Sequence, residues 1–229
     1  MFTLHKMVHK AFSIVIPTVL FFSVSVHASI ISVTETGGPS SMGTNATVIG
    51  APANALDDIV FNTGMQGFNE AQGVFTSIAH GIDGGGTVAT GSYVNSHMIF
   101  LNSQGNALLT HTGVQWTFDG NIIGVMSDSG GLLEAASTFE LGNPLTNYTA
   151  TFGGSGPAAP FPARGLEGGD SYSVSGNTIT VNMRVTEPGD WIRVITVPEP
   201  GMLALMGFAL VAFGLTRRSA YHPINAKLL

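Results

Sequence analysis

The sequence contains no cysteine, and it contains no lysine between Ser29 and Val197. The missing cysteine excludes disulfide bonds and thiolate metal sites. The same stretch has thirteen acidic residues but only three arginines, which gives it a formal charge of −10. Because such a surface repels phosphate backbones, we expect no binding to nucleic acid. It also repels acidic polysaccharides unless a divalent cation lies between the two.

Long stretches with helical periodicity are also lacking between residues 29 and 196. Short runs rich in β-branched and aromatic residues recur instead, separated by Gly, Asn, Asp and Pro. In TITVNMRV, for example, Ile179, Val181 and Met183 share one face, as in a half-buried antiparallel strand. We therefore predict an all-β domain, an antiparallel β-sandwich or jelly roll with one short inserted helix. The predicted strands lie at 30–34, 47–50, 58–61, 74–79, 87–90, 96–102, 114–118, 122–126, 148–152, 171–174, 178–185 and 191–196.

Two turns and the helix can be placed more closely. Asp119-Gly120 predicts a two-residue hairpin turn, and Ser175-Gly176-Asn177 predicts a three-residue one. The helix is expected within SDSGGLLEAASTFELG, with Asp128 or Ser129 as its N-cap. The segment after it is rich in Gly and Pro and predicts a long irregular connection.

The first 28 residues have the pattern of a secretory signal peptide. Lys6 and Lys10 precede an apolar run from Ala11 to Val26. Val26-His27-Ala28 then places small or β-branched residues where signal peptidase requires them, so cleavage is expected after Ala28. An uncleaved membrane anchor is the alternative interpretation.

Near the other end of the chain, a Pro-Glu-Pro tripeptide precedes an apolar run. Pro198 and Pro200 keep the backbone extended around Glu199, because the residue before a proline avoids the α region. The run from Gly201 to Thr216 has sixteen residues and no charge. As a helix it would span about 24 Å, somewhat less than the hydrocarbon core of a bilayer. Basic residues after such a helix stay in the cytoplasm, so the preceding domain would lie outside.

This stretch resembles the PEP-CTERM sorting tail in Val197-Pro198-Glu199-Pro200, the apolar run, and Arg217-Arg218. The resemblance implies a Gram-negative bacterium, cleavage by an exosortase in the inner membrane, and delivery to the cell surface or extracellular matrix. Such tails usually accompany systems that form exopolysaccharide, biofilm or floc. The expected organisation is therefore a signal peptide at 1–28, an extracytoplasmic domain at 29–196, a sorting signal with a transmembrane helix at 197–218, and a cytoplasmic tail at 219–229. The partners would be signal peptidase, the exosortase, exopolysaccharide and, transiently, the inner membrane.

No catalytic motif stands out in the domain, which lacks the Gly-x-Ser-x-Gly pattern. We therefore expect no enzyme activity but a structural or polysaccharide-associated role. The alternative is a secreted hydrolase or lyase that acts on matrix polysaccharide, with His97, His111, Asp119 and Asp128 as its first candidate residues. His97 shares a strand face with two aliphatic residues, which favours a hydrogen-bonded histidine within a sheet.

A third hypothesis is an adhesion module stabilised by calcium. Asp83 and Asp128 lie in turns, where carboxylate and carbonyl oxygens could coordinate this hard cation, although no complete calcium-loop motif is present. No other cofactor is expected. Among aromatic residues that could stack on sugars, the pattern places Trp116 in the core and predicts greater exposure for Trp191. Arg164 and Glu167 are close enough in sequence to pair within a loop.

Overall fold

The computed structural model describes residues 28–56, 59–148, 164–186 and 189–197. The expected signal peptide, except its last residue, lies outside the described residues. So do the sorting signal from Pro198 onward, the cytoplasmic tail, and residues 149–152 of one predicted strand. Within the described ranges, no helix is long and apolar enough to cross a membrane.

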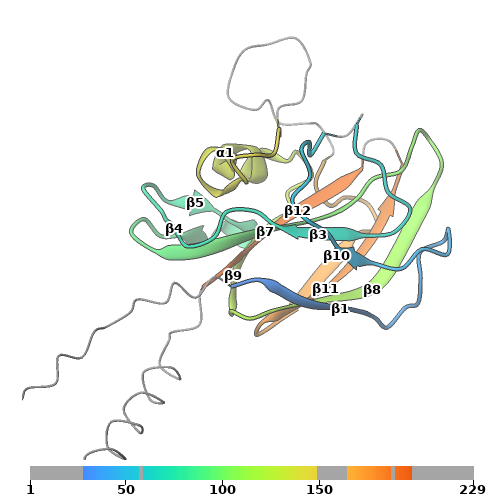
Figure 1. The fold of residues 1–229 in the computed structure, drawn as a ribbon, viewed down its shortest axis with the longest axis horizontal. Coiled ribbons are helices and arrows are strands. Elements are labelled where there is room, and N and C mark those ends of the chain that lie inside the picture. Colours follow the sequence, from blue (N-terminus) through green and yellow to red (C-terminus); the bar gives the residue numbers. More distant parts are fainter. Residues whose placement is uncertain (1–27, 57–58, 149–163, 187–188, 198–229) are drawn as a thin grey trace, which may run out of the picture.

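Four strands form the first sheet, and each pairs with its neighbours in the antiparallel direction (Figure 1). Their order in the sheet is β1 (Ile30–Glu35), β8 (Leu109–Phe118), β11 (Thr178–Val185) and β10 (Ser171–Ser175). Buried and partly exposed residues alternate along β11, as its sequence predicts.

The second sheet is built around β7 and β12, which pair along seven residues. Its strand order is β2 (Thr47–Val48), β3 (Gln66–Asn69), β7 (Tyr93–Leu101), β12 (Asp190–Thr196) and β9 (Ile122–Met126). The short β4 (Val74–Phe75) also pairs with β7. A small separate ribbon contains β5 (His80–Gly81), the 3₁₀ turn η1 (Asp83–Gly85) and β6 (Thr87–Val88).

The main hydrophobic core takes side chains from both sheets. Trp116 and Val181 of the first sheet belong to the same buried cluster as Ile99 and Ile192 of the second. The described chain is thus mostly β-strand in several antiparallel sheets, with one short α-helix and an arrangement that fits a β-sandwich. The predicted core position of Trp116 is confirmed, since its side chain is fully buried.

Strand β12 was expected to leave Trp191 partly exposed, but all seven of its residues are buried. Helix α1 (Leu132–Leu141) covers the face of the second sheet that points away from β1 and β8 (Figure 1). The expected exposure of Trp191 is therefore wrong: it is 1% exposed and its ring stacks on Phe100, with the centroids 4.1 Å apart.

The two predicted hairpin turns have different outcomes. Ser175 pairs with Thr178, so β10 and β11 form the predicted hairpin, but its loop has two residues, Gly176-Asn177, instead of the predicted three. Gly176 has a φ of 61°. The Asp119-Gly120 turn is not a hairpin, because β8 and β9 belong to different sheets. It moves the chain from one sheet to the other.

One predicted strand is absent from the structure, and two short strands, β3 and β5, were not predicted. Residues 59–61 are in no strand, although 58–61 was predicted as one. Conversely, β3 was missed because Gly67 interrupts its β-rich pattern. Gly67 is needed there, since a Cβ atom at this position would lie 2.6 Å from the Trp116 ring.

Candidate functional site

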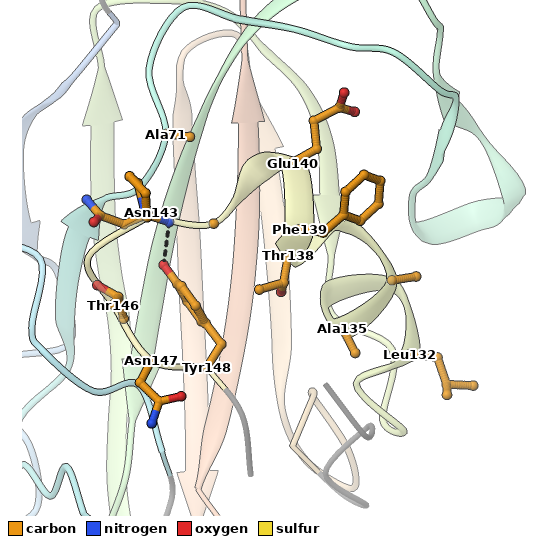
Figure 2. Close-up of a pocket in the computed structure, with 13 residues that line it drawn as sticks. Ala71, Leu132, Ala135, Thr138, Phe139, Glu140, Asn143, Thr146, Asn147 and Tyr148 are labelled. Atoms are coloured by element: carbon orange, nitrogen blue, oxygen red, sulfur yellow. Dashed lines mark hydrogen bonds between the residues drawn. The ribbon is translucent and has the colours of Figure 1, made fainter. Parts of the chain in front are cut away.

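A groove of about 750 Å³ lies beside α1. Figure 2 shows Phe139 and Leu132 on the helix, with Asn143, Thr146 and Tyr148 on the turn that comes after it. The lining consists of Ala71, Leu132, Ala135, Ala136, Thr138, Phe139, Glu140, Gly142, Asn143, Pro144, Thr146, Asn147 and Tyr148. The groove is therefore a mainly apolar surface edged by amides and hydroxyls.

The start of α1 is set by Asp128. Its carboxylate accepts hydrogen bonds from the amides of Leu132 (2.8 Å) and Leu133 (2.9 Å), two of the donors left free at a helix N-terminus. The prediction of Asp128 or Ser129 as the N-cap is wrong by position, because Gly131 is the N-cap residue; the Asp128 side chain nevertheless satisfies the first amides of the helix. The orientation of the helix leaves Leu132 and Phe139 59% and 70% exposed at the groove.

Arg193 of β12 attaches α1 to the second sheet. Its Nε and Nη2 donate to the two carboxylate oxygens of Glu70 at 2.7 and 2.8 Å. Its Nη1 donates to the carbonyl oxygen of Glu134 and to Ser137 Oγ, both at 2.7 Å. Since the Arg193 and Glu70 side chains are completely buried, the helix packs over a fully desolvated ion pair.

A second buried pair lies between Arg164 and Glu134, whose Nε and Oε2 atoms are 2.9 Å apart. The Arg164 guanidinium also lies over the Trp191 ring, 4.4 Å from its centroid. The predicted Arg164–Glu167 pairing is thus replaced by a contact with the helix. Sequence reasoning missed Arg193 and Glu70, although an arginine in the otherwise apolar run WIRVI is a signal that could have found one of them.

The groove has little charge. Among the described residues that line it, Glu140 is the one charged residue. Both of its oxygens are engaged, by the Ser77 amide at 2.6 Å and by His80 Nε2. Burial opposes these contacts, but the hydrogen bonds from Ser77 and His80 lower the pKa of Glu140. Tyr148 Oη accepts a hydrogen bond from the Asn143 amide at 2.9 Å, drawn in Figure 2. The groove therefore offers neutral polar groups.

The candidate catalytic histidines lie in the interior, away from the groove. His97 is fully buried, with Nδ1 2.8 Å from Asn69 Oδ1 and Nε2 3.0 Å from Thr196 Oγ1. Burial lowers the pKa of His97 to about 3, so the ring is neutral. The prediction of a hydrogen-bonded histidine within a sheet is confirmed.

His111 and Asp119 each make contacts within the fold and do not contact each other in any hydrogen bond or ion pair found among the described residues. His111 Nδ1 accepts from the Met65 amide at 2.9 Å, and its Nε2 is 3.1 Å from the Glu35 carboxylate. Burial lowers the pKa of His111, although Glu35 opposes the shift. Asp119 accepts a hydrogen bond from the Ser29 amide. The structure thus does not bring the four candidate catalytic residues together.

The calcium candidates Asp83 and Asp128 are both hydrogen-bonded within the fold. Asp83 accepts from the Ser127 amide (3.0 Å), from Ser127 Oγ (2.6 Å) and from the Tyr172 hydroxyl (3.0 Å). The Asp128 carboxylate is occupied by the amides at the start of α1. In the part of the chain that the structure describes, no three His, Asp or Glu residues are grouped so that they could hold a metal ion.

The junction with the C-terminal segment lies where β12 ends. Thr196 is the last strand residue, and the amide of Val197 donates to the carbonyl oxygen of Asn121 at 3.0 Å. Gly120 packs against the carbonyl of Val197 and close to Ala28 Cβ. The residue before Pro198 is thus still held by the folded domain.

The comparison with protein families identifies the segment that begins at this junction. A family model described as the PEP-CTERM protein-sorting motif matches residues 196–218. The chain contains a PEP-CTERM sorting signal. It is therefore an exported protein of the cell envelope or surface that an exosortase processes, and the resemblance seen in the sequence is confirmed. No curated protein and no solved structure matches the chain.

Proposed function

We propose that this PEP-CTERM protein is a non-catalytic component of the cell surface or extracellular matrix, in biofilm or floc, which binds neutral polysaccharide in the groove beside α1. Signal peptidase and exosortase would process it at the inner membrane before release to the surface. The observation that favours this role most is the chemistry of the groove, with an exposed aromatic ring, apolar carbon atoms and neutral polar groups together.

The charge of the domain argues for a neutral ligand. Residues 29–197 have a formal charge of −10, and two of their three arginines, Arg164 and Arg193, are buried in ion pairs with glutamates. An acidic polymer would find no compensating cation among the groove residues that the structure describes. A sugar ring instead needs an apolar face for stacking and amides or hydroxyls for its own hydroxyl groups, and Phe139 and Asn143 provide both.

The positions of the titratable side chains support the absence of catalysis. A hydrolase that cleaves glycosidic bonds requires two carboxyl groups facing each other across a cleft. The described part of the groove lining contains a single carboxylate, that of Glu140, which is bound to Ser77 and His80. A structure of this kind is suited to retention of a polymer without cleavage.

Replacing Phe139 with alanine should weaken binding of the mature protein to the neutral fraction of the host's polysaccharide roughly 2- to 12-fold, because one aromatic stacking contact is lost. Phe75→Ala is the matched control, since Phe75 is also exposed (55%) but lies on β4, outside the groove. Co-sedimentation gives the bound fraction, and a reducing-end assay on the same samples detects cleavage. Equal binding by wild type and Phe139→Ala, or new reducing ends, would contradict the proposal.

Deleting Pro198–Pro200 should abolish C-terminal processing, because the exosortase would lose the extended segment that it recognises. The full chain should then accumulate in the inner membrane fraction and be depleted from the surface. A deletion of equal length at 226–228, past the two arginines, is the control. Normal amounts of the deleted protein at the surface would show that sorting does not depend on the tripeptide.

A further inference from the structure

We propose that removal of the signal peptide creates an ion pair between the new N-terminal ammonium of Ser29 and the carboxylate of Asp119, and that this pair holds the end of the domain from which the sorting signal leaves. The inference rests on the proposed cleavage after Ala28. Hydrolysis breaks the bond between the Ala28 carbonyl carbon and the Ser29 nitrogen. Water supplies the hydroxyl of the new Ala28 carboxyl group, and the released amine is protonated.

The geometry for this ion pair is already present in the uncleaved chain. The Ser29 nitrogen donates a hydrogen bond to Asp119 Oδ1, while the Asp119 amide donates back to the Ser29 carbonyl at 3.1 Å. These two hydrogen bonds connect the residue before β1 to the turn after β8. When the Ser29 nitrogen becomes an ammonium group, the same contact becomes a charge-assisted hydrogen bond, which is about twice as strong as a neutral one.

No other described cation competes for Asp119. The buried arginines Arg164 and Arg193 pair with glutamates, and Arg184 lies opposite Thr110, at the other end of β8 from Asp119. The ion pairs found among the described residues do not include Asp119. Lysine is absent from the whole domain between Ser29 and Val197. The N-terminal ammonium is therefore the cation placed to neutralise this carboxylate.

The same turn also holds the C-terminal junction. Asp119 is followed by Gly120, which packs against Val197, and by Asn121, whose carbonyl accepts the Val197 amide. Ala28 itself is fully buried beside Gly120. Because a peptidase needs extended and accessible backbone, cleavage requires this part of the chain to be undocked, and the ion pair forms when the new N-terminus docks against Asp119. Processing at the N-terminus is thereby coupled to the turn that holds Val197, the last described residue before the Pro-Glu-Pro tripeptide.

The scarcity of lysine makes this ion pair measurable. In the mature chain the only amines are the α-amine of Ser29 and Lys227, and Lys227 is lost if the tail is trimmed. An amine-selective acylating reagent, applied from pH 6 to 10 and followed by peptide mass spectrometry, gives the apparent pKa of each amine. A carboxylate in contact raises the pKa of an α-amine by about one unit from its ordinary 7.7–8.0, so labelling at pH 7.5 should be about sevenfold slower than in Asp119→Asn.

Asp119→Asn is a suitable variant because its Oδ1 can still accept the Ser29 hydrogen bond, so the fold is retained. Glu167→Gln, which removes an equal charge from an exposed turn, should label like the wild type. Steric shielding alone would slow labelling without moving the apparent pKa, so the same pKa in wild type and Asp119→Asn would overturn the ion pair while leaving export intact. An intact mass that begins at a residue other than Ser29 would overturn both this inference and the expected signal peptidase site.

Discussion

Replacing Arg193 with alanine is expected to lower the free energy of unfolding by about 3–5 kcal/mol, because it leaves the Glu70 carboxylate buried without its partner. For a domain of this size the midpoint of thermal unfolding should fall by about 6–20 °C. Arg193 also donates to the Glu134 carbonyl and to Ser137, so its loss removes the contacts that fasten α1 to β12. Thermal unfolding followed by circular dichroism measures the effect.

Two further variants separate the cost of an unpaired charge from general damage. Arg184→Ala removes an exposed arginine from β11 and should unfold within about 0.5 kcal/mol of the wild type. Combining Arg193→Met with Glu70→Gln removes both charges and should be clearly more stable than Arg193→Ala. If Arg193→Ala unfolds at the same temperature as the wild type, the buried ion pair does not hold the helix on the sheet.

Replacing Asp190 with asparagine is expected to stabilise the protein at alkaline pH and to leave it almost unchanged near pH 4. Asp190 is 1% exposed. Among the described residues, no N–H or O–H group donates a hydrogen bond to its Oδ2 atom. Burial, followed by the carboxylates of Asp170 and Glu167, raises the pKa of Asp190 to about 10. At neutral pH the native state therefore keeps a proton that the unfolded chain releases near pH 4.

Proton linkage gives the direction in which the free energy of unfolding changes with pH. Between the unfolded and folded pKa values the native state binds one more proton, so the wild type loses up to about 1.4 kcal/mol of stability per pH unit as the pH rises. The Asp190 carboxyl is hydrogen-bonded to Asp170, and the amide of asparagine can donate this bond without binding a proton from solution. Between pH 5 and pH 8 the stability of the variant relative to the wild type should therefore increase by up to about 4 kcal/mol. Urea unfolding at several pH values tests this. Glu167→Gln, which keeps Asp190, should retain the pH-dependent loss, and parallel curves for wild type and Asp190→Asn would contradict the assignment.

Local patterns were sufficient for the parts of the fold that depend on local interactions. The alternation in β11 gave the strand and its buried face, Gly176 marked a hairpin because its φ is positive, and Asp128 marked the start of α1 because it satisfies free amides there. The sorting signal was also visible from sequence, since its three parts are contiguous. Each of these features depends on residues that are close together in the sequence.

The remaining features depend on residues far apart in the chain. Arg193 and Glu70 are separated by 123 positions, so no local pattern indicates their pairing. Trp191 was predicted to be more exposed because the sequence does not reveal that α1 covers the outer face of β12. Asp119-Gly120 has the composition of a hairpin turn, but the sheet assignment of the strands on either side decides its role. The groove is likewise formed by α1, the turn after it and Ala71 together.

The most direct test of this account is the intact mass of the protein isolated from the cell surface. We expect a chain that begins at Ser29 and has lost the peptide containing Arg217 and Arg218, because signal peptidase and the exosortase have acted at the two ends. Surface protein that still contains Arg217 and Arg218 would contradict the central claim that an exosortase processes this chain.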